Sequence, residues 1–173
     1  MASSCSMAVM MSSLLVREEH VVFIDSANAF NPFLIAEVAT RLNRPPEELR
    51  DRIHASRTFT VHQLEALVAE RISAALNTYA SRVPVASGLL DNLYDEDVKR
   101  LEAWRIFRKA AAHLRPLTEA GTLVLVVCSA PAIRLPDRGS PLDALIATPD
   151  RVIKLEAATL YLEKPVPVSP PTA

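Results

Sequence analysis

The chain has 173 residues with 19 basic and 20 acidic side chains, and half of its residues are hydrophobic. This length and composition predict one globular domain and exclude a disordered chain. The net charge of −1 excludes capture of nucleic acid by bulk charge. The chain has three glycines, whereas an average protein of this length has about twelve. Because phosphate-binding loops are built from glycine, this count argues against a complete nucleotide site.

The two cysteines, Cys5 and Cys128, lack the spacing of metal ligands, and Cys128 lies in an apolar run. This usage favours reduced thiols and a cytoplasmic protein. The apolar run at 5–16 is interrupted by two serines and has no basic residue before it, so it does not read as a signal peptide. Every apolar run is shorter than the roughly 18 residues that cross a membrane, so we expect no membrane association.

Clear helix and strand signals begin near the N-terminus. The apolar segment Ser6–Val16 predicts a short buried helix. Val21–Asp25 is a β-branched apolar run that ends in an acid, which is typical of a buried parallel strand. Asn31 followed by Pro32 predicts the start of a second helix, because asparagine caps helices and proline suits the first helical position. Pro45 ends that helix.

The middle of the chain predicts a short helix at 46–51, a short strand at 53–56 and a long helix that starts at Thr60. The apolar positions of the long helix recur every three or four residues: Val61, Leu64, Val68, Ile72, Leu76 and Tyr79.

The apolar run Val83–Leu90 predicts the next strand. A helix should follow the acids at 95–97, which suit a helix N-terminus, and Pro116 should kink or end it. We expect the following residues on the inner face of this helix: Leu101, Trp104, Phe107, Ala111 and Leu114.

The last part of the chain begins with the clearest strand of the sequence, 123–127. A proline-rich loop at 130–141 follows, and two late strands at 152–155 and 159–162 are expected to form an antiparallel hairpin. The alternation of strands and helices predicts an α/β domain with a mostly parallel sheet over 1–163. Residues 164–173 form a proline-rich tail.

Two segments resemble RecA/RadA-type recombinase ATPases. Phe23–Pro32 (FIDSANAFNP) is similar to the strand and turn that follow the P-loop helix of that family. Ala55–Leu64 (ASRTFTVHQL) is similar to the family's Ala-Arg-Ala-Phe stretch before a His-Gln pair. Weaker likeness extends over 6–162 and places 130–142 where the family has its second DNA-binding loop. The resemblance implies a RecA-like three-layer sandwich, with ATP and Mg²⁺ as ligands.

The residues that such an ATPase needs are replaced. The sequence contains no Gly-x-x-x-x-Gly-Lys-Ser/Thr loop, whose amides and lysine would hold the phosphates. Ala27 stands at the position of the family's water-activating glutamate, Ala86 at that of its magnesium-associated aspartate, and Ala130 at that of its nucleotide-sensing glutamine. The resemblance therefore implies that ATP and Mg²⁺ bind only if an upstream P-loop or a partner supplies the site.

The family's P-loop strand pairs on both sides within its sheet, and the helix at 6–16 occupies the place of the helix after that loop. A missing strand would leave buried backbone groups unpaired, at about 1–3 kcal/mol for each group. Three solutions are open: a rearranged sheet, a strand from a partner chain, or a start of the protein upstream of Met1.

Four candidate site residues have alternative interpretations. Asp25 is a candidate for a metal or water role, or it caps the turn before Asn31. Arg57 is a candidate contact to a nucleotide or a neighbouring protomer, or it pairs with a surface acid. Asp91, with Asp95 and its acidic neighbours, is a candidate cation site or favours the helix start. His62 is more readily a surface histidine than a ligand.

The candidate DNA contacts are arginines and lysines in two places. Arg134 and Arg138 lie in the predicted loop at 130–141, where recombinase-like proteins touch DNA. The predicted helix around Trp104 has a basic outer side, which contacts phosphates or is simply its solvated face: Lys99, Arg100, Arg105, Arg108, Lys109 and Arg115.

The first functional hypothesis is a degenerate, non-hydrolysing RecA/RadA-like adaptor or paralogue in DNA recombination or repair. Its partner would be a RecA-like protomer or a second copy of this chain, with DNA as a further ligand. The alternatives are an active RecA-like ATPase whose P-loop lies upstream, and a metal-dependent hydrolase that uses Asp25 with Asp91 or Asp95.

Overall fold

The computed structural model describes residues 10–12, 14–94, 97–128, 144–145, 147 and 149–152. Four strands form one sheet in the order β2-β1-β3-β4, and every pairing is parallel. The strands are β1 (Val21–Asp25), β2 (Ile53–Arg57), β3 (Val83–Ser87) and β4 (Leu125–Val127). The predicted α/β class with a parallel sheet is confirmed.

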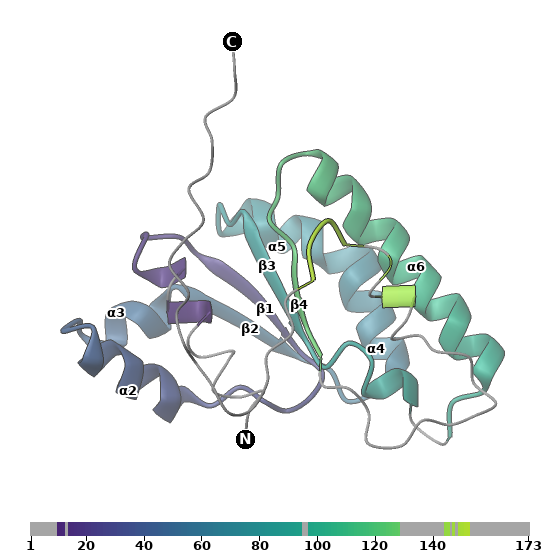
Figure 1. The fold of residues 1–173 in the computed structure, drawn as a ribbon, viewed down its shortest axis with the longest axis horizontal. Helices are drawn as coiled ribbons and strands as arrows, with labels where there is room; N and C mark the ends of the chain where they lie inside the picture. Colours follow the sequence, from purple (N-terminus) through teal and green to yellow (C-terminus); the bar gives the residue numbers. More distant parts are fainter. Residues whose placement is uncertain are drawn as a thin grey trace, which may run out of the picture.

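Helices cover both faces of this sheet (Figure 1). The helical segments are α2 (Pro32–Arg41), α3 (Pro46–Asp51), α4 (Val61–Ala66), the π turn η1 (Leu67–Arg71), α5 (Ile72–Thr78), the 3₁₀ turn η2 (Asn92–Tyr94) and α6 (Arg100–Glu119). The helices α2 and α3 lie on one side of the sheet, and α4, α5 and α6 lie on the other (Figure 1). Within the described residues, no helix is long and apolar enough to cross a membrane.

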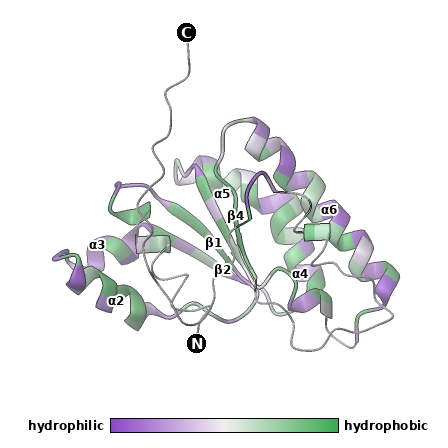
Figure 2. Cartoon of the chain, in the orientation of Figure 1, coloured by the Kyte–Doolittle hydropathy of each residue, from purple (hydrophilic) through white to green (hydrophobic). Residues whose placement is uncertain are grey.

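The central strand β1 is buried on both faces, so its alternating side chains enter two different cores. Val21 and Phe23 pack with Met11, Leu15 and the residues of α2 and α3. Val22 and Ile24 pack with the other three helices. Hydrophobic and hydrophilic residues alternate along the helices α2 and α6 (Figure 2).

Local signals explain where two helices begin. The Asn31 side chain accepts a hydrogen bond from the Phe33 N–H at 3.0 Å, so Asn31 caps α2 as expected. The Thr60 hydroxyl accepts from the Gln63 N–H at 3.2 Å and caps α4. The Gln63 side chain in turn accepts from the Phe59 N–H at 2.8 Å, which fixes the approach of the chain to the helix.

The long helix expected from Thr60 contains a π turn in its middle. Its buried residues Leu64, Val68, Ile72 and Leu76 are spaced by four. In a regular α-helix, each such step overshoots one turn by about 40°, so three steps would rotate the stripe by about 120°. The extra residue of the π turn removes about 100° of that rotation. The π turn therefore keeps all four side chains directed at the sheet.

One expectation for α6 is wrong. Leu101 is 84% exposed, because it lies about 200° around the helix from the buried Ala103. The buried residues are Ala103, Ile106, Phe107, Ala110 and Leu114, which include Phe107 and Leu114 of the expected face. Pro116 lies inside the helix, which ends at Glu119, before Gly121, and bonds the Ala120 N–H to the Pro116 carbonyl at 3.0 Å. Its missing N–H removes only one bond in the last turns.

Other differences from the expected structure concern the length and the pairing of the strands. Strand β3 is shorter than the predicted strand 83–90 and ends at Ser87. It pairs directly with β4, and no described strand lies between them. The predicted antiparallel hairpin is not part of the observed sheet, and nearly all of it, 153–155 and 159–162, lies outside the described residues.

The strand order reverses at β1, since the chain crosses first to β2 and then back over β1 to β3. The turns that follow β1 and β3 are in close contact at this point. Gly88 has a φ of +69°, and a Cβ built on it would lie 2.4 Å from the Ala27 Cβ and 2.6 Å from the Ala27 nitrogen. Only glycine fits this position without moving the backbone of the neighbouring turn.

We expect Gly88→Ala to destabilise the fold by about 2 kcal/mol more than Gly121→Ala. Both glycines have a positive φ, but a Cβ at Gly121 meets nothing within 4 Å, so the second variant measures the backbone cost alone, about 1–2 kcal/mol. Urea unfolding of the two variants measures the difference. Equal destabilisation would show that the Ala27 contact has no steric effect.

Candidate functional site

The carboxyl ends of the four parallel strands bring polar side chains to one edge of the sheet. Asp25 ends β1, Arg57 ends β2, Ser87 ends β3, and Cys128 follows β4. Asp25 and Arg57 are register partners in neighbouring strands, so their side chains lie on the same face. In parallel α/β sheets this edge is where ligands bind, which makes it the candidate site.

The Asp25 side chain is 1% exposed and is fully engaged by its surroundings. Its Oδ1 accepts a hydrogen bond from the Ala29 N–H at 2.8 Å, and its Oδ2 accepts one from the Phe30 N–H at 3.2 Å. The Arg57 Nε donates to Oδ2 at 3.3 Å. Asn28 has a φ of +51°, which folds the turn back over the carboxylate. Asp25 therefore has the turn-capping role that the sequence left open.

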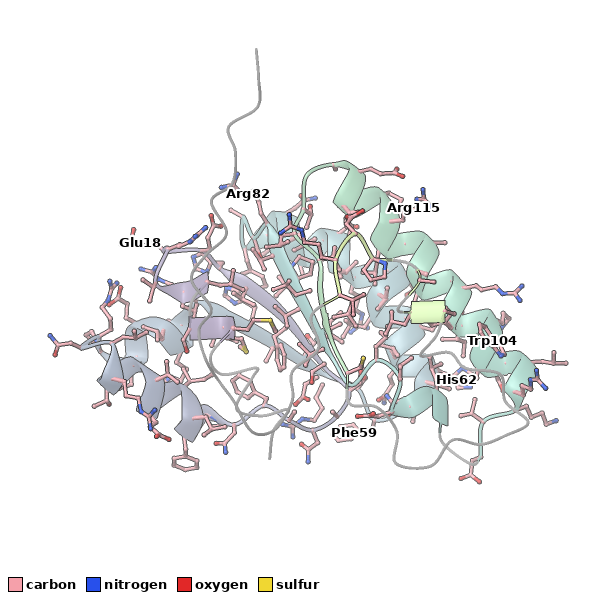
Figure 3. The ribbon with its side chains drawn as sticks, in the orientation of Figure 1. Glu18, Phe59, His62, Arg82, Trp104 and Arg115 are labelled. Atoms are coloured by element: carbon pink, nitrogen blue, oxygen red, sulfur yellow. The ribbon has the colours of Figure 1, made fainter. Side chains whose placement is uncertain are left out.

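Arg57 pairs with this buried acid and not with a surface acid. Its side chain remains 42% exposed, so part of the guanidinium faces solvent. Two residues along the chain, Phe59 is 68% exposed, and its side chain projects from the same edge (Figure 3). The site thus presents a cation and an aromatic ring outward while its acid is buried.

Hydroxyl and amide groups link three strand ends beneath this surface. The Ser26 and Thr58 hydroxyls are buried and lie 2.7 Å apart. The Asn92 Nδ2 donates to the Thr58 hydroxyl at 3.5 Å. The sequence analysis missed these three residues, although Ser26 and Thr58 each directly follow a strand, and that position was the available signal. They make the edge rigid, because each buried polar group has a partner.

The backbone continues this network past the ends of the strands. The Ser26 N–H donates to the Ser87 carbonyl at 2.9 Å, the Gly88 N–H to the Val127 carbonyl at 3.0 Å, and the Thr58 N–H to the Asp25 carbonyl at 3.0 Å. The turns at this edge are therefore held together by main-chain bonds as well as by side chains.

The pKa values of Asp91 and Cys128 are both raised at the β4 side of the edge. Desolvation by the surrounding protein raises the pKa of the Asp91 carboxyl. Burial raises the pKa of the Cys128 thiol, and the negative charge of Asp91 adds to this. Cys128 therefore stays a neutral thiol at pH 7 and is a poor nucleophile or metal ligand. Asp95 lies outside the described residues, and no three potential metal ligands converge among those described.

Three alanines mark the positions of chemical groups in the resembled ATPases. Ala27 lies against Gly88, and Ala86 is buried in the core beneath α4–α6. Ala130 lies outside the described residues, as do the candidate DNA contacts Arg134 and Arg138. Two of the three positions that the resemblance assigned to chemical groups are thus methyl groups within the described residues.

The basic outer side of α6 is largely engaged within the chain. Arg105 and Lys109 both bind Glu65 of α4, at 2.8 Å and 2.9 Å from its Oε1. Arg108 lies over the Trp104 ring at 6.0 Å. Arg115 pairs with Glu119 at 3.1 Å and projects from the helix far from the candidate site (Figure 3). Because four of these six basic residues have partners, this face is a weaker candidate for phosphate contact than its sequence indicated.

The histidine of the resembled segment is a surface residue. His62 is exposed, and its Nε2 lies 3.5 Å from the Glu102 carboxylate.

No model of a known protein family matches this chain. The function must therefore be argued from the residues and from the geometry of the edge.

We expect Asp25→Ala to destabilise the protein by about 2–4 kcal/mol, because two backbone N–H groups in a tight turn lose their acceptor. Arg57→Gln should cost less than about 1 kcal/mol, since the arginine is half in solvent. Chemical unfolding of both variants measures the contrast. A neutral or stabilising effect of Asp25→Ala would indicate a residue kept for chemistry instead of structure.

Glu65 generates a prediction about acid stability. Hydrogen bonds from Arg105 and then Lys109 lower its pKa to about 2 from 4.5. Because its pKa is lower in the folded state, its contribution is present above pH 4.5 and is lost as the pH falls toward 2. Glu65→Gln should cost about 1 kcal/mol at pH 7, since both partners are largely solvated.

The matched control for this measurement is Glu119→Gln, which removes an exposed i,i+4 pair and should cost about 0.3 kcal/mol. Urea unfolding between pH 7 and pH 3 follows the difference between each variant and the wild type. A Glu65→Gln effect that equals the Glu119→Gln effect at pH 7, or that does not shrink with acid, would contradict the prediction.

Proposed function

We propose that this chain is a non-hydrolysing RecA-like protein that acts as an adaptor or paralogue in DNA recombination or repair. In this proposal it packs against a RecA-like protomer that has its own ATP site. The observation that carries the proposal is that the groups at the carboxyl ends of the strands are engaged by this chain itself. Asp25 accepts three hydrogen bonds there, and the turn after β1 packs against the turn after β3, where a nucleotide or a metal ion would have to bind. The assignment to recombination and to the cytoplasm rests on the sequence alone.

At the point where the strand order reverses, the turns after β1 and β3 are in contact. In doubly wound sheets, ligands bind in the crevice outside the strands at this point. Here Ala27 packs against Gly88, and the Ser26 N–H donates to the Ser87 carbonyl. The Asp25 carboxylate accepts three hydrogen bonds from this chain. An incoming Mg²⁺ would have to displace these donors.

The sequence supports the absence of hydrolysis by this chain alone. Ala27 offers no base to activate water, and loss of a positioned general base costs about 10²–10⁴ in rate. Phosphoryl transfer depends on a phosphate cradle and a metal ion, and the sequence contains no glycine-rich Lys-Ser or Lys-Thr loop.

The exposed residues of the same edge support contact with a protein. Arginine and aromatic side chains contribute most to binding energy at protein interfaces, and Arg57 and Phe59 present both types outward. The guanidinium of Arg57 also suits the phosphates of a nucleotide held by a neighbouring protomer. In this proposal the fold is RecA-like, the late segments form an antiparallel hairpin, and Arg134 and Arg138 belong to a DNA-binding loop.

The first test measures nucleotide binding by the isolated chain. Labelled ATP with Mg²⁺ should show no saturable binding at concentrations up to about 1 mM, because no cradle holds the phosphates. Equilibrium dialysis with and without EDTA measures this. Tight, Mg²⁺-dependent binding would overturn the proposal and favour an active nucleotide site.

The second test measures binding of the chain to its proposed partner. The chain should bind an ATP-loaded RecA-like ATPase of the same organism, and Phe59→Asp or Arg57→Glu should weaken that binding at least tenfold, since both change the exposed edge. Leu101→Asp is the control, because Leu101 is also an exposed apolar residue but lies on α6. Unchanged binding of the Phe59 and Arg57 variants would remove this edge as the interface.

A further inference from the structure

Two histidines and a tyrosine meet at the amino edge of the sheet, opposite the candidate site. His20 precedes β1, His54 lies in β2, and Tyr79 ends α5. The His20 Nδ1 and the His54 Nε2 are 3.0 Å apart, in a partly buried hydrogen bond. The His54 and Tyr79 rings are stacked, with centroids 3.4 Å apart and planes inclined by 6°.

Hydrogen bonds tie the same three segments together around these rings. The Ser81 hydroxyl donates to the His20 carbonyl at 2.7 Å and accepts from the Val83 N–H at 3.3 Å. The Val21 N–H donates to the Arg52 carbonyl at 2.9 Å. The histidine pair therefore lies where the starts of β1, β2 and β3 are joined.

We propose that the His20–His54 pair is a proton-sensitive clasp that holds the amino edge of the sheet closed at neutral pH and opens it in acid. An N–H···N bond between two imidazoles needs one nitrogen without a proton. When both rings are protonated, each of the facing nitrogens carries a hydrogen, so the bond is lost. Two positive charges then face each other across the same 3.0 Å gap.

The surrounding charges do not compensate for this second proton. Glu19, next to His20, is paired with Arg82 at 3.2 Å. Arg52 is directed to the Leu15 carbonyl and to Glu48. The face of the Tyr79 ring favours a cation on His54, whereas burial, the charge of His20 and the loss of the hydrogen bond oppose it. Among the described residues, the histidine in an ion pair with a carboxylate is His62, not His20 or His54.

The pKa of His54 is shifted in the direction that such a clasp requires. Burial lowers its pKa first, and the charge of His20 lowers it further. Because the pKa is lower in the folded state, the stabilisation is present above the unfolded value of 6.5 and is lost as the pH falls through the folded value. The exposed histidines His62 and His113 lie elsewhere, on α4 and α6.

Amide hydrogen exchange on the wild-type chain tests local opening directly, in a buffer with a chelator that removes metal ions. Between pH 7.5 and 5.5, the opening constant at the Val21 amide should rise by up to tenfold for each pH unit, the limit for uptake of one proton. The Ser26 amide at the opposite edge bonds the Ser87 carbonyl, and its opening constant should not change. An equal change at both amides, or none at Val21, would overturn the clasp.

Four single variants test whether the pH response of the Val21 amide comes from the His20 and His54 rings. His54→Phe keeps a ring stacked on Tyr79 and His20→Gln keeps a hydrogen-bonding side chain, but both remove the paired titration. The Val21 response should disappear in these two variants and persist in His62→Gln and His113→Gln. A wild-type response in His54→Phe and His20→Gln would overturn the proposal.

Imidazole ¹⁵N spectra of the wild-type chain give a readout that does not depend on the folding of any variant. The expected result is that His54 takes up its proton below pH 6.5, because burial and then the charge of His20 lower its pKa. Protonation of His54 at pH 6.5 or above would overturn the clasp.

Discussion

Burial of the central strand on both faces is the constraint from which the geometry of the candidate site follows. β1 has helices on either side and paired strands at either edge, so its terminal Asp25 has almost no contact with water. An ionised carboxylate in such a place needs several donors. The turn 26–30 supplies two of them from its backbone, and Arg57 of the adjacent strand supplies the third.

That requirement shapes the surface that other molecules meet. Because the turn folds back onto its own acid, Ala27 is brought against Gly88, and the ends of β1 and β3 are joined. Arg57 keeps part of its positive charge accessible at this edge. An exposed guanidinium suits acidic or phosphorylated groups on another molecule.

The sequence predicted the parts of the fold that depend on local signals. Val21–Asp25 is a strand because five residues must be buried on both sides, and α2 starts at Asn31 because its side chain caps the helix. The face of α6 was predicted wrongly because its inner side uses alanines, which carry little hydrophobic signal, whereas the exposed Leu101 carries much. The prediction followed the size of the apolar side chains, whereas in the structure small alanines face the core.

The sequence identified individual residues of the candidate site but not which side chains bond to one another. Asp25 and Arg57 were both identified, yet their pairing depends on the register of β1 against β2, which no local pattern encodes. Ser26, Thr58 and Asn92 escaped notice because each is an ordinary polar residue until three strand ends meet. Short polar side chains become a network only through tertiary contact.

The π turn at Leu67–Arg71 also determines where this helix can change in length. Removal of one residue there would convert the turn to regular α-helix, and the buried side chains would then be spaced by four, three and four residues. Eleven residues separate Leu64 from Leu76 in that helix, which amounts to three full turns and about 20°, so Ile72 and Leu76 would still face the core. A shortening by one residue is therefore accommodated inside the turn, whereas the same deletion elsewhere in the helix, with the turn kept, would rotate the downstream half by about 100°.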